Sequence, residues 1–236
     1  AMAGTPTHAV VTLALPTQFE AARIEAIYAG MNALARRHGV AIVGGETTSN
    51  PERLLLSIAL LGTVPRSRQV LRSGAKAGDA IFVTGTLGGS LSGRHFDFEP
   101  RLPEARWLAE RFTVHAMIDL SDGLAGDLRH ILDASGVGAD LLSSAIPISR
   151  AARLQSRAES SAKPPLLAAL TDGEDFELLF TVASRTAVPL LDAWKAQFPE
   201  VKLSCVGKIT SQPGLRLSDA RGLREFSLRG YEHFSP

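Results

Sequence analysis

The 236-residue chain has a net charge of +1, with 45% hydrophobic and 21% charged residues, which is the composition of an ordinary globular protein. This balance provides no overall basic field for nucleic acid or for an anionic membrane, and no apolar stretch approaches the ~20 residues that span a bilayer. The single cysteine, Cys205, excludes an internal disulfide framework and fits a reducing compartment. We therefore expect a cytoplasmic protein without nucleic-acid or membrane partners, and we expect Cys205 to be buried in a strand.

The first part of the chain predicts strands around one amphipathic helix. A strand is predicted at residues 9–15. A helix with a capping box at Thr17 and Glu20 follows, and Gly39 is placed to end it. The remaining predictions here are a short strand at 40–43, a glycine-rich loop at 44–51 and a long strand at 54–64. The start lacks a polar lead-in, so we expect the chain to begin inside a larger unit.

The second part alternates strands and helices, and we place the domain boundary so that residues 1–65 and 66–236 form separate domains. After a glycine loop at 85–89, the apolar spacing of Leu124, Leu128 and Ile131 predicts the buried face of a helix. Other elements are predicted as strands at 80–84, 116–119, 139–142, 178–182 and 203–209, helices at 103–112 and 188–198, and an exposed loop at 155–163. The alternation favours an α/β or α+β fold.

The stretch at residues 118–124, IDLSDGL, concentrates the chemistry-bearing side chains. Asp119 and Asp122 flank Ser121 between a predicted strand and a predicted helix. Strand-end carboxylates are ligands for Mg²⁺, and a helix N-terminus faces anions such as phosphate. A surface turn with Ser121 as a simple N-cap remains the alternative.

Other acidic residues also stand beside glycines, where the backbone can approach a ligand closely. Glu46 follows two glycines and Glu174 follows Gly173, while Arg72 is a candidate partner for phosphate oxygens. Each of these acids taken alone fits a solvated loop. The sequence has no P-loop, no zinc-type histidine spacing and no GxSxG elbow. Arg94, beside His95, is predicted to lie in a surface loop.

Five segments occur in the order found in the thiamine-monophosphate kinase family of the aminoimidazole-ribonucleotide-synthetase-like superfamily, and the chain resembles that family over nearly all its length. The segments are residues 44–48 (GGETT), 72–79 (RSGAKAGD), 83–88 (VTGTLG), 119–124 (DLSDGL) and 173–180 (GEDFELLF). The closing residues 230–234 (GYEHF) are similar to the family's C-terminal signature. The 119–124 and 173–180 segments single out the kinase among its relatives.

The resemblance implies a two-domain aminoimidazole-ribonucleotide-synthetase-like fold with a truncated N-terminal, ATP-binding domain at residues 1–65. It implies direct transfer of the ATP γ-phosphoryl group to thiamine monophosphate with Mg²⁺ ions, in a homodimer and without a covalent enzyme intermediate, and it identifies no catalytic residue. The site residues it implies are the metal ligands Glu46, Asp119 and Asp122, the ATP contacts Gly45, Glu46, Arg72 and Ser121, and the substrate contacts Glu174 and Tyr231.

The chain departs from the family pattern at three places. The family usually has Asp at Glu46 and Gly at Asp172, and it has an N-terminal portion with further aspartates that this chain lacks. Two alternatives therefore stay open: a non-catalytic fragment or binding module, and another ATP-dependent synthetase of the same superfamily.

Overall fold

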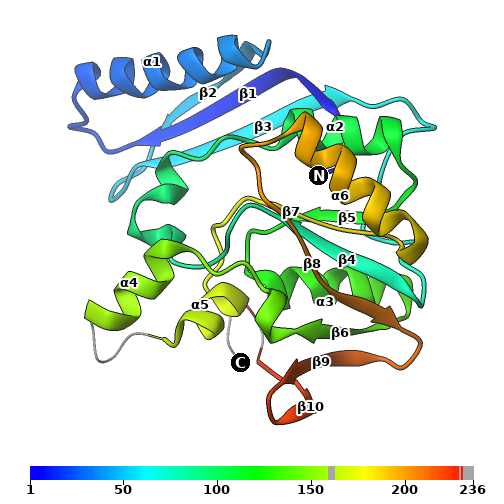
Figure 1. The fold of residues 1–236 in the computed structure, drawn as a ribbon. Helices are drawn as coiled ribbons and strands as arrows, with labels where there is room; N and C mark the ends of the chain where they lie inside the picture. The colour runs from blue at the N-terminus through cyan, green and yellow to red at the C-terminus, as the bar shows by residue number, and fades with distance from the viewer. Residues whose placement is uncertain (159–162, 229, 231–236) are drawn as a thin grey trace. The chain divides into compact units, whose positions relative to one another are not determined.

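The computed structural model describes residues 1–158, 163–228 and 230 (Figure 1). The chain forms two compact units, one of residues 4–67 and one that joins residues 1–3 to residues 68–236. The smaller unit holds the first three strands and one helix, and the larger unit holds the remaining elements.

In the smaller unit, a three-stranded sheet has the order β2-β1-β3. The central strand β1 (Thr5–Leu15) runs parallel to β2 (Ala41–Ser49) and antiparallel to β3 (Leu55–Thr63). Helix α1 (Ala21–Arg37) begins after Glu20, which makes no side-chain capping bond. The predicted capping box is therefore wrong, because the Glu20 carboxylate pairs with Arg23 at 3.2 Å instead.

Residues 44–49 form part of β2 rather than the predicted loop. Strand β1 supplies a parallel partner along this whole stretch, with Glu46 opposite Thr12. At Gly45, a Cβ atom would lie 1.7 Å from the carbonyl oxygen of Val11, so only glycine permits this close backbone approach. The glycines that suggested a loop are thus required by strand pairing.

The larger unit is built on a seven-stranded mixed sheet of order β10-β9-β6-β8-β4-β7-β5 (Figure 1). Its strands are β4 (Asp79–Thr84), β5 (Val114–Asp119), β6 (Gly138–Leu142), β7 (Leu178–Ala183), β8 (Leu203–Thr210), β9 (Gly214–Asp219) and β10 (Gly222–Glu225). Its helices are α2 (Leu102–Arg111), α3 (Leu124–Ser135), α4 (Arg150–Ala158), α5 (Pro165–Thr171) and α6 (Ala187–Gln197). Strands β9 and β10 were not predicted.

Two apolar cores lie on opposite faces of this sheet, because successive side chains of a strand point to opposite sides. Ile81 and Val83 of β4 belong to the core that contains α3, including the predicted face of that helix. Phe82, between them, belongs to the core beneath α2 and α6, where it stacks on Phe180 with 5.6 Å between ring centroids. The sheet is therefore covered by helices on both faces.

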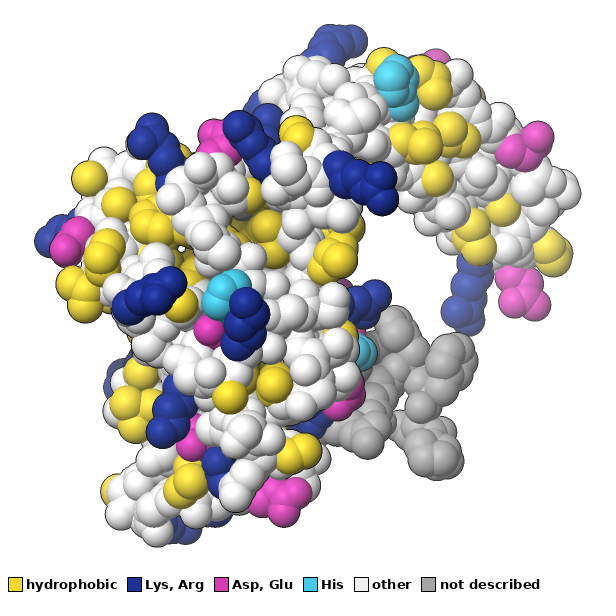
Figure 2. All heavy atoms as spheres, turned by 90° about the vertical axis from the view of Figure 1, so that its right-hand side faces the viewer, with side chains coloured by type: hydrophobic (Ala, Val, Ile, Leu, Met, Phe, Trp, Pro, Cys, Tyr) yellow, Lys and Arg dark blue, Asp and Glu magenta, His cyan; other side chains and the backbone are white. Residues whose placement is uncertain are grey.

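Two sequence-based predictions are wrong, one about burial and one about secondary structure. Cys205 is exposed on β8, because its neighbours Ser204 and Val206 occupy the buried positions of that strand. Residues 155–158 end helix α4 rather than starting a loop. Several large apolar side chains are also exposed, and hydrophobic side chains are visible in patches on the face shown in Figure 2. Within the described ranges, no helix combines the length and the apolar character needed to cross a bilayer.

Candidate functional site

The turn between β5 and α3 carries the predicted metal and phosphate ligands. Leu120 is fully buried and anchors the turn, and Gly123, with a φ of 96°, precedes the first helical residue. Asp119 is exposed, while Ser121 and Asp122 are half-buried. The first N–H groups of a helix have no intrahelical partners and attract anions. The turn therefore presents carboxylates and a helix N-terminus together, as the sequence predicts.

Arg72 and Asp119 line one cavity of about 510 Å³ in the larger unit. Its walls come from the N-terminal residues, the segment before β4 and the end of β5: Ala1, Met2, Leu71, Arg72, Ser73, Met117, Ile118 and Asp119. The segment after Arg72 is held by α3, because Ser135 Oγ accepts hydrogen bonds from the N–H groups of Gly74 (3.1 Å) and Ala75 (3.2 Å). The fold thus brings a guanidinium group and a carboxylate, 47 residues apart in sequence, to a shared space.

Glu174 is held beside the same turn. Its backbone N–H donates to the carbonyl oxygen of Ser121 at 2.8 Å. Gly173 makes this approach possible, since a Cβ atom there would lie 2.5 Å from that oxygen and since its φ of 76° is unfavourable for other residues. The structure therefore brings together Ser121, Asp122 and the segment that carries Glu174.

We expect Gly173→Ala to lower the free energy of unfolding by at least ~2 kcal/mol and to reduce activity, because the methyl group must displace the turn. Gly136→Ala is the matched control: Gly136 has a similar φ of 66° but open space around its Cβ position. The control should lower the free energy of unfolding, because its backbone is strained, but it should keep its activity. Thermal unfolding and turnover of both variants measure this, and equal activities would show that the close approach has no functional consequence.

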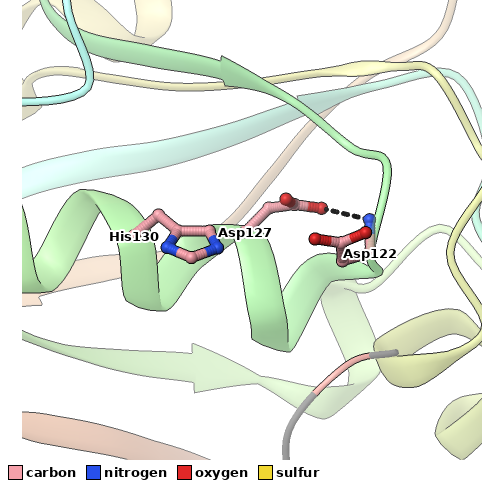
Figure 3. Close-up of side chains that lie close together, drawn as sticks. All are labelled: Asp122, Asp127 and His130. Atoms are coloured by element: carbon pink, nitrogen blue, oxygen red, sulfur yellow. Dashed lines mark hydrogen bonds between the residues drawn. The ribbon is translucent and has the colours of Figure 1, made fainter. Parts of the chain in front are cut away.

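Asp127, in the first turn of α3, is a functional candidate that the sequence analysis missed. Its carboxylate is buried and accepts a hydrogen bond from the backbone N–H of Asp122 at 3.0 Å (Figure 3). Burial, together with the smaller effect of the Asp122 and Asp119 charges, raises the pKa of Asp127 to about 7, although the hydrogen bond from the Asp122 N–H lowers it. Ligand atoms of Asp122, Asp127 and His130 lie within 4.8 Å of one another. The i, i+3 spacing of Asp127 and His130 on a helix was the available signal.

A buried ionic network lies beneath the 173–177 segment. The Glu177 carboxylate is 2% exposed and pairs with Arg101 at 2.8 Å and Arg94 at 2.5 Å. It also accepts a hydrogen bond from Thr84 Oγ1 at 2.7 Å. The prediction that Arg94 belongs to a solvated surface loop is therefore wrong, because its guanidinium also donates to the Thr86 carbonyl at 2.6 Å. The Glu177 bond raises the pKa of Arg101.

Asp175, between Glu174 and Phe176, turns its carboxylate to the glycine loop. Gly88 N–H lies 3.0 and 2.9 Å from its two oxygens, and Ser90 Oγ donates to it at 2.6 Å. Burial raises the pKa of Asp175 to about 6, although these bonds lower it. A carboxylate that is kept ionised here at neutral pH therefore costs folding free energy.

This cost has a pH signature. Between the ordinary pKa of 3.8 and the folded pKa of about 6, the folded chain binds more protons at Asp175 than the unfolded chain, so stability falls as pH rises through this window. The shift corresponds to about 3 kcal/mol. We therefore expect the Tm of Asp175→Asn, relative to that of the unaltered chain, to rise by about 5 °C or more between pH 4 and pH 7.5. Parallel Tm profiles against pH would contradict this.

The departure at Asp172 is compensated locally. Its carboxylate pairs with Lys163 at 2.8 Å and lies 3.4 Å from the N–H of Gly89. The extra negative charge beside the Glu174 segment is therefore matched by a neighbouring cation.

Two predicted site residues belong to the smaller unit, and a third is not among the described residues. Gly45 and Glu46 belong to β2 of the smaller unit. Tyr231 lies outside the described residues, although Gly230 packs against Asp122, where a Cβ atom at position 230 would be 1.9 Å from the Asp122 carbonyl oxygen. Arg129 of α3 donates hydrogen bonds to the carbonyl oxygens of Phe226 and Leu228. These bonds hold the segment that precedes Gly230.

Comparison with known proteins gives consistent family matches. Residues 1–64 match the AIR synthase related protein N-terminal domain, and residues 76–219 match the corresponding C-terminal domain. The chain is 41% identical over 235 residues to a thiamine-monophosphate kinase of Rhodopirellula baltica, covering 99% of this chain and 72% of that protein.

Solved structures with a similar fold point to the same family. A crystal structure of thiamine-monophosphate kinase from Stenotrophomonas maltophilia has a TM-score of 0.79 at 31% identity, over 92% of this chain and 73% of that one. A structure described as AaThiL complexed with AMPPCP and TMP has a TM-score of 0.80 at 27% identity, over 99% and 75%. With this fold, these motifs and these matches, the chain belongs to the thiamine-monophosphate kinase family of the AIR synthase related superfamily.

Proposed function

We propose that this chain transfers the γ-phosphoryl group of ATP to thiamine monophosphate, giving thiamine diphosphate, with Mg²⁺ bound by Asp119 and Asp122. The ATP-dependent kinase activity follows from family membership. The assignment of individual residues rests on one observation: Arg72 and Asp119 share a cavity next to the turn where Ser121, Asp122 and the Glu174 segment meet.

The donor set at this turn suits a hard cation. Burial and, to a smaller extent, the charges of Asp122 and Asp119 raise the pKa of Asp127, and a cation bound by these carboxylates would relieve their mutual repulsion. When bound, Mg²⁺ neutralises phosphate charge and brings the two anionic reactants together. Glu46 is proposed as a further ligand, and Gly45 as an ATP contact, on the strength of their motif.

The remaining residues would bind and orient the reactants. Arg72 offers a planar guanidinium to phosphate oxygens, and Ser121 with the N-terminus of α3 offers hydrogen-bond donors. Glu174 would face the cationic thiazolium, and Tyr231 would offer a cation–π surface. A phosphate oxygen of thiamine monophosphate then forms the new bond to the γ-phosphorus as the β–γ bridging bond breaks and ADP leaves. Positioning and electrostatics carry such a reaction, so no covalent enzyme intermediate is needed.

The decisive experiment mixes the chain with ATP, Mg²⁺ and thiamine monophosphate and follows thiamine diphosphate by chromatography. We expect a product that requires Mg²⁺ and does not form with thiamine itself. Acceptance of a different phosphorylated acceptor in its place would contradict the substrate assignment.

A non-catalytic binding module is the second candidate, since the chain matches 72–77% of the length of four of its curated relatives. Titration of ATP with and without Mg²⁺ separates the two, because Mg²⁺-dependent binding with turnover excludes a module that only binds. The other superfamily synthetases are disfavoured by the 41% identity to a kinase.

A homodimer is part of the proposal, and a cytoplasmic location remains our prediction. Strand β3 exposes Leu56, Ile58 and Leu60, with Ile58 49% and Leu60 62% exposed. An apolar edge strand favours association with another chain. Sedimentation equilibrium measures the mass, and a monomer at micromolar concentration would contradict the dimer.

A further inference from the structure

The segment that carries Glu174 has an unusual backbone. Glu174 and Phe176 adopt positive φ values of 57° and 50°, in the left-handed region that non-glycine residues avoid. Two such residues within three positions cost free energy and persist only where the surroundings hold them. The segment 173–177 is therefore held in place by its contacts.

On one side, the backbone of this segment is bonded to the turn after β5. Glu174 N–H donates to Ser121 O, and Phe176 N–H donates to Leu120 O, both at 2.8 Å. The ring of Phe176 also stacks on Phe98, with 4.3 Å between centroids. These contacts fix the backbone but leave the residue between Glu174 and Phe176 to make its own contacts.

That residue, Asp175, connects the segment to the glycine loop at residues 85–89 and to Ser90, which follows it. Its carboxylate is 1% exposed and accepts hydrogen bonds from Gly88 N–H and Ser90 Oγ. Its carbonyl oxygen accepts a further bond from Arg94 at 3.1 Å. These donors are all protein groups, and they occupy the oxygens of Asp175. Asp175 is therefore placed to hold the structure together rather than to contact the substrate.

We propose that Asp175 is a positioning residue that locks segment 173–177 to the glycine loop and thereby holds the Glu174 carboxylate where it binds the cationic part of the acceptor substrate. This proposal rests on the proposed role of Glu174 in binding thiamine monophosphate. It adds that acceptor affinity depends on a buried residue that does not touch the acceptor.

A merely structural residue would give a different result. Loss of such a residue lowers the stability of the protein and weakens the binding of every ligand to a similar extent. Loss of the lock, in contrast, selectively weakens the binding of the acceptor substrate. Asparagine keeps one acceptor oxygen and cannot ionise, so Asp175→Asn should retain stability at pH 7.5 and part of the lock. Asp175→Ala should lose the lock. Asp140→Asn is the matched control, since Asp140 pairs with Arg216 at 2.7 Å on strands away from this segment.

Two measurements on the full chain test the proposal. In amide hydrogen exchange, Asp175→Ala should accelerate exchange of residues 173–177 and 85–90 about tenfold or more, while strand β6 stays unchanged. In calorimetry with Mg²⁺ and a non-hydrolysable ATP analogue, its Kd for thiamine monophosphate should rise about tenfold, with the analogue's own Kd within about twofold. For Asp175→Asn and Ser90→Ala, both the exchange rates and the Kd for thiamine monophosphate should lie between those of Asp175→Ala and of the unaltered chain. If Asp175→Ala does not fold, these two variants provide the test.

Repeating the comparison in a Glu174→Ala background separates the proposal from the function on which it rests. If Glu174→Ala weakens the binding of thiamine monophosphate and Asp175→Ala causes no further loss of affinity in that background, the lock acts through Glu174. An equal additional loss, or unchanged exchange in segment 173–177, would overturn the proposal while leaving the role of Glu174 intact. Unchanged acceptor binding in Glu174→Ala alone would overturn the role of Glu174. It would also overturn the proposal that Asp175 acts on acceptor binding through Glu174.

Discussion

Replacing Asp122 by asparagine is expected to lower kcat by roughly 10²- to 10³-fold, the usual consequence of losing one preorganised electrostatic group at a phosphoryl- or acyl-transfer site. Asparagine keeps the shape and one oxygen but removes the charge that draws a divalent cation. Stability should not fall, because the Asp122 charge raises the pKa of the neighbouring Asp127 and its removal relieves repulsion between the two. Turnover and Tm, measured on the same preparation, give both quantities.

Asp133→Asn is the control for this change, because Asp133 lies on an exposed position of the same helix, α3. Mn²⁺ binding, followed by electron paramagnetic resonance, gives a readout that does not require turnover. We expect weakened binding in Asp122→Asn and unchanged binding in Asp133→Asn. Undiminished Mn²⁺ affinity and turnover in Asp122→Asn would show that Asp122 is not a metal ligand.

The second large effect is expected at Glu177, where Glu177→Ala should lower the free energy of unfolding by about 3–5 kcal/mol. The substitution removes the carboxylate that pairs with Arg94 and Arg101, side chains that are only 31% and 19% exposed. The cost arises because the guanidinium groups remain partly buried without their partner. For a chain of this length, the Tm should fall by roughly 6–20 °C.

A surface pair provides the comparison for Glu177. Arg68 and Glu110 form an ion pair at 2.9 Å with both side chains more than half exposed, so Glu110→Ala should cost less than about 1 kcal/mol. Equal losses at Glu177 and Glu110 would contradict the importance of burial.

Local sequence patterns predicted the larger unit well because its signals act over short distances. The apolar spacing of Leu124, Leu128 and Ile131 predicts the buried face of the observed helix α3, since one face of a helix is read from neighbouring residues. The same reasoning failed at residues 44–49, where a strand contains glycines that usually indicate a loop. Pairing with β1, more than 30 residues away in sequence, decides that conformation.

Contacts between distant segments also explain why Asp127, Asp175 and the Glu177 network were missed. Asp175 and Glu177 stand in a motif whose resemblance assigned a role only to Glu174, and nothing in the local sequence shows which of these acids is buried. Arg94 was predicted to lie in a surface loop, because the local sequence does not show its partner Glu177. Burial and partners arise only when β7, the glycine loop and the segment before α2 fold together.

The sequence by itself determined the family, the helix α3 and the turn at residues 119–123, because motifs and hydrophobic periodicity are local properties of the chain. Only the tertiary structure decided that Arg72 and Asp119 line the same cavity and that Glu174 lies against Ser121. It also decided that Asp127 and Asp175 are buried carboxylates with raised pKa values. The physical reason is that burial and close approach depend on contacts between segments far apart in sequence, which no local pattern encodes.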